Sequence, residues 1–171
     1  DIHGRITDGV GFAKMATKVQ ELRESNSNLL LLDAGDAFHG LPTATITKGE
    51  SILKIMNALE YDAMALGNHD FDYGQERLLE LKEMATFPIL SANTFREDGS
   101  LLLPAYILQD YEGIRVAVFG LSPQTTAFET NPKNVKGLTF ENPVAVAKEM
   151  VSKLENQADV IILLSHLGLD D

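Results

Sequence analysis

Cysteine is absent from this chain of 171 residues. Its absence excludes disulfides, thiolate metal ligands and cysteine nucleophiles, but it leaves the cellular compartment open, because both cytosolic and exported proteins can lack it. Positive charge is also scarce, since 14 lysines and arginines stand against 25 acidic residues, for a net charge of −11. Non-specific binding to a nucleic-acid backbone requires the opposite sign, so the composition disfavours that function.

Long hydrophobic runs are missing as well. No apolar run approaches the ~20 residues that a membrane-spanning helix needs. Hydrophobic residues make up 44% of the chain and charged residues 23%, which are ordinary values for a globular protein. The length allows one domain with a sizeable core. An anionic substrate would have few cationic side chains to meet it, and bound metal ions can neutralise it instead.

Short apolar runs alternate with helical patterns along the chain. The sequence predicts helices over 10–24, 50–59, 75–84 and 143–155, and short strands over 29–32, 63–66, 88–93 and 160–164. The runs 29–32 and 160–164 are predicted to be buried, and residues 102–108 and 114–119 to form a hairpin around Glu112-Gly113. Residues 121–141 lack periodicity and are predicted to be loop. The pattern indicates an α/β domain with largely parallel core strands plus one hairpin.

Polar side chains follow three of the apolar runs. Gly35-Asp36 comes after 29–32, Gly67-Asn68-His69 after 63–66 and His166 after 160–164, while Asp1 and His3 stand at the start of the chain. Each segment alone is explained as well by a turn, a helix cap or a solvated terminus. Because parallel strands deliver their carboxyl ends to one edge of a sheet, we expect the four segments to converge on a common site.

The side chains in these segments are carboxylates, imidazoles and an amide. Oxygen and nitrogen donors without a soft ligand suit divalent ions of intermediate hardness such as Mn, Zn or Fe. The sequence therefore predicts a metal site at this edge of the sheet.

Three motifs together resemble the calcineurin-like metallophosphoesterase superfamily. They are Asp1-Ile2-His3-Gly4, Gly35-Asp36-Ala37-Phe38-His39-Gly40 and Gly67-Asn68-His69-Asp70-Phe71-Asp72-Tyr73-Gly74, followed by His166 after an apolar run. Within the superfamily they are similar to the 5′-nucleotidase and UDP-sugar hydrolase branch, as is Leu90-Ser91-Ala92-Asn93. The resemblance implies a layered α/β/β/α-like fold and an extracytoplasmic protein that is periplasmic, secreted or held at the cell surface.

The resemblance also implies a role for each site residue. Asp1 and His3 hold one divalent ion, Asn68 and His166 hold the other, and Asp36 bridges both. His69 is the catalytic acid or cation at the phosphate, and Asp72 orients it. His39 is interpreted as a non-ligand and Asp70 as a supporting partner. The implied reaction is hydrolysis of a nucleotide, or of another small phosphate ester, by in-line attack of a metal-bound hydroxide on phosphorus.

One departure from the superfamily pattern concerns the remaining ligands. The superfamily supplies two more from a Gly-His-x-His motif, which is not found in these 171 residues. We therefore expect residues 1–171 to be a partial catalytic domain, incomplete at both ends and without the nucleoside-binding domain of the nucleotidase branch. By itself such a fragment should bind metal weakly and turn over little substrate.

Two alternative functions stay open. A 2′,3′-cyclic nucleotide phosphodiesterase with 3′-nucleotidase activity looks similar across these residues; Asp72 favours the nucleotidase branch, and Tyr73 points weakly to the other. A non-catalytic surface or binding relative is disfavoured by the intact set of ligands and by the pairing of His69 with Asp72. The oligomeric state is not indicated by the sequence.

Overall fold

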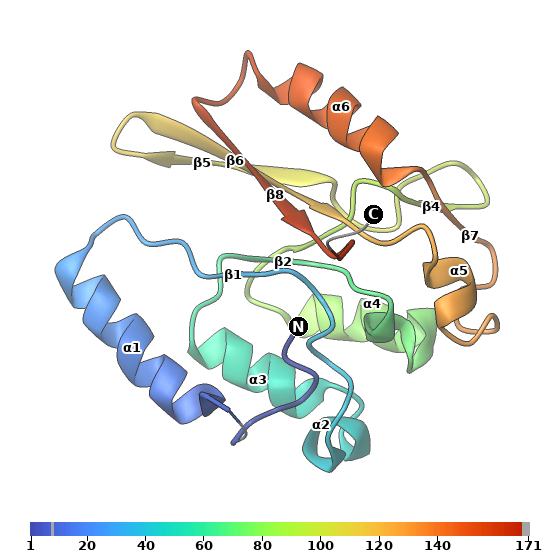
Figure 1. Cartoon of the computed structure of the whole chain (residues 1–171), viewed down its shortest axis with the longest axis horizontal. Helices are drawn as coiled ribbons and strands as arrows, with labels where there is room; N and C mark the ends of the chain where they lie inside the picture. The colour runs from blue at the N-terminus through green and yellow to red at the C-terminus, as the bar shows by residue number, and fades with distance from the viewer. Residues whose placement is uncertain (8, 169–171) are drawn as a thin grey trace.

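Two three-stranded sheets lie face to face between layers of helices (Figure 1). The structure is a computed structural model that describes residues 1–7 and 9–168. The first sheet is parallel and has the order β1 (Leu32–Asp33), β2 (Ala63–Ala65), β3 (Ile89–Leu90). In the second, β6 (Ile114–Leu121) is antiparallel to β5 (Tyr106–Tyr111) and parallel to β8 (Val160–Ser165). A separate antiparallel pair joins β4 (Thr94–Arg96) to β7 (Leu138–Phe140).

Helices cover the outer faces of both sheets. The helices α1 (Gly11–Ser25), α3 (Glu50–Ala58) and α4 (Gly74–Met84) lie on the side of the first sheet, and α6 (Pro143–Leu154) covers the second. The remaining helical segments are short: α2 (Pro42–Ile46), the 3₁₀ turn η1 (His69–Phe71) and α5 (Thr126–Glu129). No helix in the described part of the chain is both long and apolar enough to cross a membrane.

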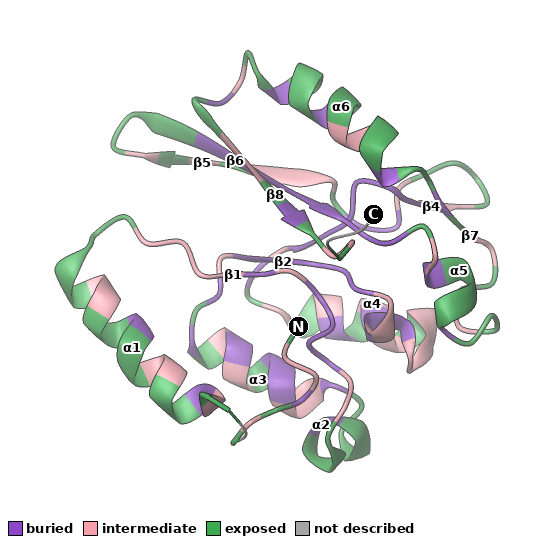
Figure 2. Cartoon of the chain, in the orientation of Figure 1, coloured by how far each residue is buried: buried purple, intermediate pink, exposed green. Residues whose placement is uncertain are grey.

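The strand β2 shows why the layers stack in this way. Side chains alternate between the two faces of a strand. Met64 therefore packs among buried side chains of the helical layer, while Ala63 and Ala65 face the second sheet. The small side chains let the sheets approach closely, and at Gly120 of β6 an added Cβ would lie 2.5 Å from the Leu90 carbonyl oxygen. Figure 2 shows the resulting buried layer along β2 and β6.

Most predicted elements are confirmed. The four predicted helices correspond to α1, α3, α4 and α6, and Asn142 caps the last of them by accepting a hydrogen bond from the Ala145 N–H. The predicted hairpin corresponds to β5 and β6, which pair at Tyr111 and Ile114 around the expected turn. The predicted α/β class with a parallel sheet and a hairpin is confirmed, and the layered arrangement matches the expectation from the resemblance.

The predicted buried strand at 29–32 is wrong in extent. Only Leu32 belongs to β1, and all four leucines are half-buried. The cause lies elsewhere in the chain, because the Leu31 N–H donates to the side chain of Asp62, 31 residues further along, at 2.6 Å. The strand β1 is also an edge strand of its sheet in the described residues. The strand predicted over 88–93 is shorter too, at Ile89–Leu90.

Two further predictions are corrected. The run 160–164 forms β8 as predicted, but it is not fully buried, since Val160 is 45% and Leu163 is 40% exposed. The reason is that β8 lies at one edge of its sheet in the described part of the chain. Residues 121–141 are not all loop, because they contain α5 and β7. The strand β7 has three residues and depends on pairing with the distant β4, so no local periodicity could reveal it.

Candidate functional site

The loops after β1 and β2 pack directly on each other. A Cβ added to Gly67 would collide with the Asp36 side chain, so only glycine permits this approach. The His69 N–H then donates to Asp36 Oδ1 at 2.8 Å. Two motifs that are more than thirty residues apart in the sequence therefore form one unit around the Asp36 carboxylate.

Asp70 holds the Asp36 loop through backbone hydrogen bonds. Its buried carboxylate accepts backbone N–H bonds from Gly67, Asp36, Ala37 and Phe38, at 2.9 to 3.2 Å. Burial, together with the charge of Asp36, raises the pKa of Asp70 to about 7, and the N–H donors act against this rise. These bonds keep Asp36 at a φ of 58°, a left-handed conformation that is uncommon outside glycine. The predicted supporting role of Asp70 thus has a structural basis.

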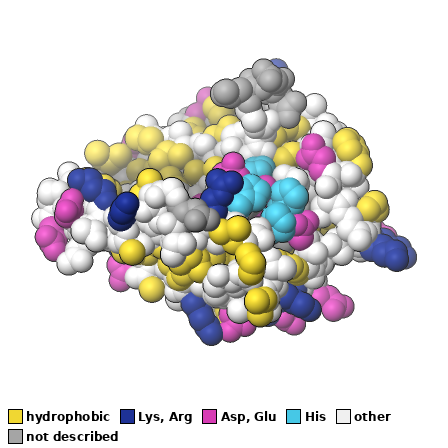
Figure 3. Space-filling model, turned by 60° about the horizontal axis from the view of Figure 1, so that its bottom comes forward, with side chains coloured by type: hydrophobic (Ala, Val, Ile, Leu, Met, Phe, Trp, Pro, Cys, Tyr) yellow, Lys and Arg dark blue, Asp and Glu magenta, His cyan; other side chains and the backbone are white. Residues whose placement is uncertain are grey.

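Side chains from the start of the chain and from the end of β8 converge on the Asp36 carboxylate. His166 Nε2 lies 3.2 Å and His3 Nε2 lies 3.7 Å from Asp36 Oδ2, and Asp1 Oδ1 lies 2.6 Å from His3 Nε2. His166 comes from the second sheet, so the common edge is made by two stacked sheets instead of the single sheet that the sequence argument assumed. Figure 3 shows histidine side chains gathered at one place on the surface with acidic side chains beside them.

The charges in this group favour cation binding. Burial acts to raise the pKa of Asp36, but the contact with His166 and the N–H of His69 outweigh it and hold this pKa below its usual value. Burial lowers the pKa of His3, despite the nearby Asp36. Asp36 is therefore an ionised carboxylate and His3 a neutral imidazole at neutral pH, which are the forms that bind metal ions. The contact with Asp36 raises the pKa of His166, and a metal ion would replace its proton.

The residues present fit a divalent metal ion. Ligand atoms of Asp1, His3 and Asp36 all lie within 4.8 Å of one another. They are carboxylate oxygens and an imidazole nitrogen, a donor set that suits Mn, Zn or Fe. His166 Nδ1 lies 2.9 Å from the Ala34 carbonyl oxygen, which orients the ring with Nε2 toward Asp36, as is typical of metal-binding histidines.

Asn68 lines a cavity that adjoins this group. It is half-buried, and the cavity, of about 370 Å³, is also lined by Asp1, His166 and Glu129. The structure thus brings all five predicted metal ligands to one place. Glu129 belongs to α5, in the region that the sequence predicted to be loop.

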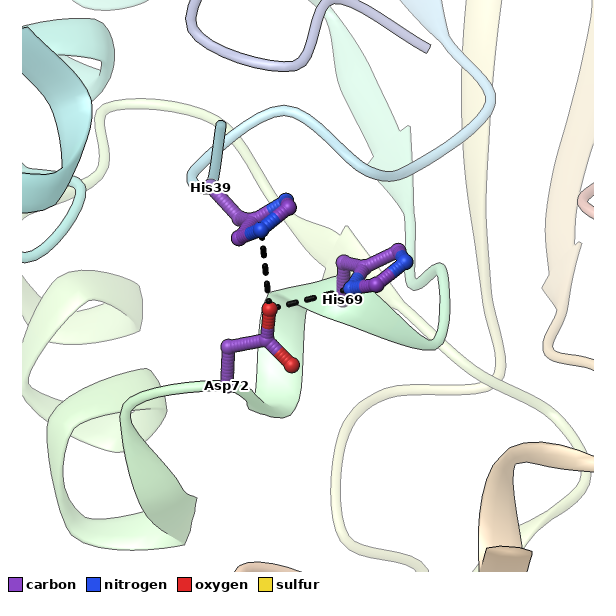
Figure 4. A group of neighbouring side chains, drawn as sticks. All are labelled: His39, His69 and Asp72. Carbon is purple, nitrogen blue, oxygen red and sulfur yellow. Dashed lines mark hydrogen bonds and ion pairs between the residues drawn. The ribbon is translucent and has the colours of Figure 1, made fainter. Parts of the chain in front are cut away.

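The predicted catalytic pair, His69 and Asp72, is drawn in Figure 4. It lies beside the Asp36 group, since the ring centroids of His69 and His3 are 5.7 Å apart. His69 Nδ1 is 2.9 Å from Asp72 Oδ2, and the His69 side chain is 36% exposed. Thr130 donates a hydrogen bond to Asp72 Oδ1 at 3.2 Å, and the Asn134 side-chain amide donates to the Asp72 carbonyl at 2.8 Å. Sequence reasoning missed Thr130 and Asn134, because they lie in an aperiodic segment and no motif marks them.

The sequence did not indicate the position of His39 either. Its Nε2 lies 3.2 Å from the same Asp72 oxygen that His69 contacts. The two imidazole rings are stacked, with centroids 4.4 Å apart and planes inclined by 9°. Its place in the motif Gly35–Gly40 was visible, but its partner was not, since Asp72 is 33 residues further along the chain.

Comparisons with known proteins agree with the geometry. The model of the calcineurin-like phosphoesterase family matches residues 1–171. The 5′-nucleotidase of Vibrio cholerae serotype O1 is 37% identical over 179 residues, covering 98% of this chain and 32% of that protein. The 5′-nucleotidase of Homo sapiens is 41% identical over 169 residues, covering 94% of this chain and 29% of that protein. The chain thus spans about a third of the length of these relatives.

A solved structure shows the same fold. The calcineurin-like phosphoesterase YfkN from Bacillus subtilis superimposes with a TM-score of 0.88 at 31% identity, over 99% of this chain and 60% of that one. Its match extends across the described sheets, helices and site loops. The chain belongs to the calcineurin-like phosphoesterase family.

Proposed function

We propose that this chain carries the catalytic residues of a metal-dependent phosphomonoesterase that acts on 5′-nucleotides. The observation that carries the proposal is the position of Asp36, whose carboxylate meets His166 and His3 on one oxygen and the His69 N–H on the other. His3 and His166, the proposed ligands of different ions, both face Oδ2, so this oxygen is placed to be shared by two cations while the His69 N–H fixes the carboxylate through Oδ1. The nucleotide substrate is proposed because both curated relatives named above are 5′-nucleotidases.

The metal ligands in this proposal are Asp1 and His3 for one ion, Asn68 and His166 for a second, and Asp36 for both. When bound, such ions neutralise charge on the phosphate and lower the pKa of a bound water. Asp36 keeps the proposed ligands of the two ions in a fixed arrangement. Its loop is held by Asp70, and its side chain is held by the His69 N–H. The identity of the metals is left to measurement, since the donors suit Mn, Zn and Fe alike.

His69 is the proposed general acid. Its Nδ1 is engaged by Asp72, so Nε2 is the nitrogen left to face the site and to donate a proton to the leaving oxygen. Asp72 fixes this tautomer and stabilises the imidazolium. Thr130 restrains Asp72 in turn through its other oxygen. In this proposal the metal ligands around Asp36 are distinct from the pair His69 and Asp72, which transfers the proton.

The test is an assay of the protein in its full natural length. We expect release of inorganic phosphate from AMP in the presence of Mn²⁺ or Zn²⁺, and loss of this release after treatment with a chelator. Activity that persists without any divalent ion would contradict the proposal. A protein that binds ions but hydrolyses no phosphate ester would instead be a non-catalytic relative.

The competing substrate class is a 2′,3′-cyclic nucleotide. Rates on AMP and on 2′,3′-cyclic AMP, measured side by side, separate the two activities. We expect the higher kcat/KM for AMP, and a preference for the cyclic nucleotide would assign the chain to the alternative.

We also propose an extracytoplasmic location, supported by the likeness to 5′-nucleotidases, and fractionation of the producing cells tests it.

A further inference from the structure

His39 has two contacts that the proposed mechanism does not use. Its ring lies flat against the ring of His69, and its Nε2 lies 3.2 Å from Asp72 Oδ2 (Figure 4). Its Nδ1 is buried and has no hydrogen-bond partner among the described residues. Because Nδ1 finds no acceptor there, the ring proton is best placed on Nε2, where the Asp72 carboxylate can accept it.

A third metal ion would be the obvious occupant, since ligand atoms of His39, His69 and Asp72 lie within 4.8 Å of one another. The ring orientation argues against it. An imidazole binds a metal ion through a lone pair that lies in the plane of the ring. The planes of His39 and His69 are nearly parallel and stacked, so one ion cannot lie in both.

We propose that His39 is a positioning residue for His69. The χ2 torsion of histidine is broad, so one hydrogen bond to Asp72 leaves the His69 ring some freedom to rotate. A flat ring against one face of His69 restricts that rotation, and a second donor on Asp72 Oδ2 restrains the carboxylate itself. Together these contacts hold Nδ1 of His69 on Asp72 and keep Nε2 toward the site. The inference rests on the proposed role of His69 as the acid.

The first test uses metal-free protein of full natural length, labelled with ¹⁵N-histidine. In wild type we expect His69 to appear as a single tautomer with its proton on Nδ1. In His39→Ala we expect two tautomers or an averaged signal, and in His39→Gln, whose amide can still donate to Asp72, a return toward the single form. An unchanged His69 signal in His39→Ala would overturn the proposal.

The second test uses the metal-loaded enzyme. A small misplacement of a catalytic group can cost up to about 10²-fold in rate. We expect His39→Ala to lower kcat by roughly 10-fold to 100-fold with KM within about twofold, and His39→Gln to recover part of the loss. Metal content should be unchanged, and a loss of metal in proportion to kcat would make His39 a ligand and overturn the positioning role.

The matched control is Thr43→Ala, an exposed position in α2 shortly after His39. It should leave both the His69 signal and kcat unchanged.

The proposed function and the positioning role of His39 fail in different ways. A wild-type protein that releases no phosphate contradicts the proposed function, while the spectrum of His69 in the metal-free protein still decides whether His39 positions that ring.

Discussion

Two neighbouring groups of side chains in this protein are built from the same two residue types and differ in how these are oriented. In the Asp36 cluster (Asp1, His3, Asp36 and His166), imidazoles from distant segments approach one carboxylate from different elements. In the Asp72 cluster (His39, His69 and Asp72), two imidazoles lie parallel and share one oxygen. The first arrangement can surround a cation, and the second can hold a ring and its proton in place. Residue type alone therefore does not define a role here.

The largest expected effect is at the centre of the Asp36 cluster. Asp36→Ala removes the carboxylate that meets both His3 and His166, so bound metal should fall to background and turnover by roughly 10³-fold or more. Elemental analysis of the purified protein and phosphate release from AMP measure the two effects. Asp159→Ala, which removes an exposed carboxylate paired with Arg115, is the control and should retain both. Full metal content in the Asp36 variant would break the bridging assignment.

The next effect separates the two clusters. His69→Ala removes the proposed acid without removing a ligand, so turnover should fall by roughly 10²–10⁴-fold while the metal content stays that of wild type. The same two measurements apply. Wild-type turnover would exclude the acid role, and loss of metal would place His69 with the Asp36 cluster instead.

A smaller effect is expected at Asp72. Asp72→Asn keeps the shape of the side chain but removes the charge that stabilises the His69 imidazolium, so kcat should fall by roughly 10-fold to 100-fold with metal retained. The ¹⁵N signals of His69 in the metal-free protein report whether its tautomer is still fixed. Equal kcat in the variant and in wild type would show that Asp72 does not act through His69.

The smallest effect is expected at Thr130. Thr130→Val removes the hydroxyl that donates to Asp72 Oδ1 and keeps the volume of the side chain. A single hydrogen bond contributes about 1 kcal/mol, so kcat should fall by roughly fivefold. Thermal melting of the variant shows whether the loss comes from the site or from the fold. A drop larger than that of Asp72→Asn would show that Thr130 does not act through Asp72 alone.

The sequence identified much of the site through local signals. Apolar runs that end in Asp36, Asn68 and His166 marked the places where chemistry could gather, and the structure brings these residues together. The same reasoning could not identify Thr130 and Asn134, since both support Asp72 from a segment without periodicity. Nor could it place His39, whose partner lies on another loop.

The fold shows the same division between local and distant information. Helix spacing, the Asn142 cap and the hairpin turn are properties of a few adjacent residues, so the sequence determined them. Whether Leu29–Leu32 would continue as a strand depended on Asp62, which takes the Leu31 N–H, and the existence of β7 depended on β4. Pairing of this kind joins residues that are distant in the chain, and periodicity does not record it.

By itself the sequence determined which residues are present at the ends of strands and which chemistry their donors allow. Only the tertiary structure decided how those side chains are divided between the Asp36 cluster and the Asp72 cluster. The division depends on ring orientation and on which oxygen each group faces, and these follow from the packing of the two sheets and of the loops after β1 and β2. The same histidine can hold a cation or a proton, and its neighbours in space determine which it does.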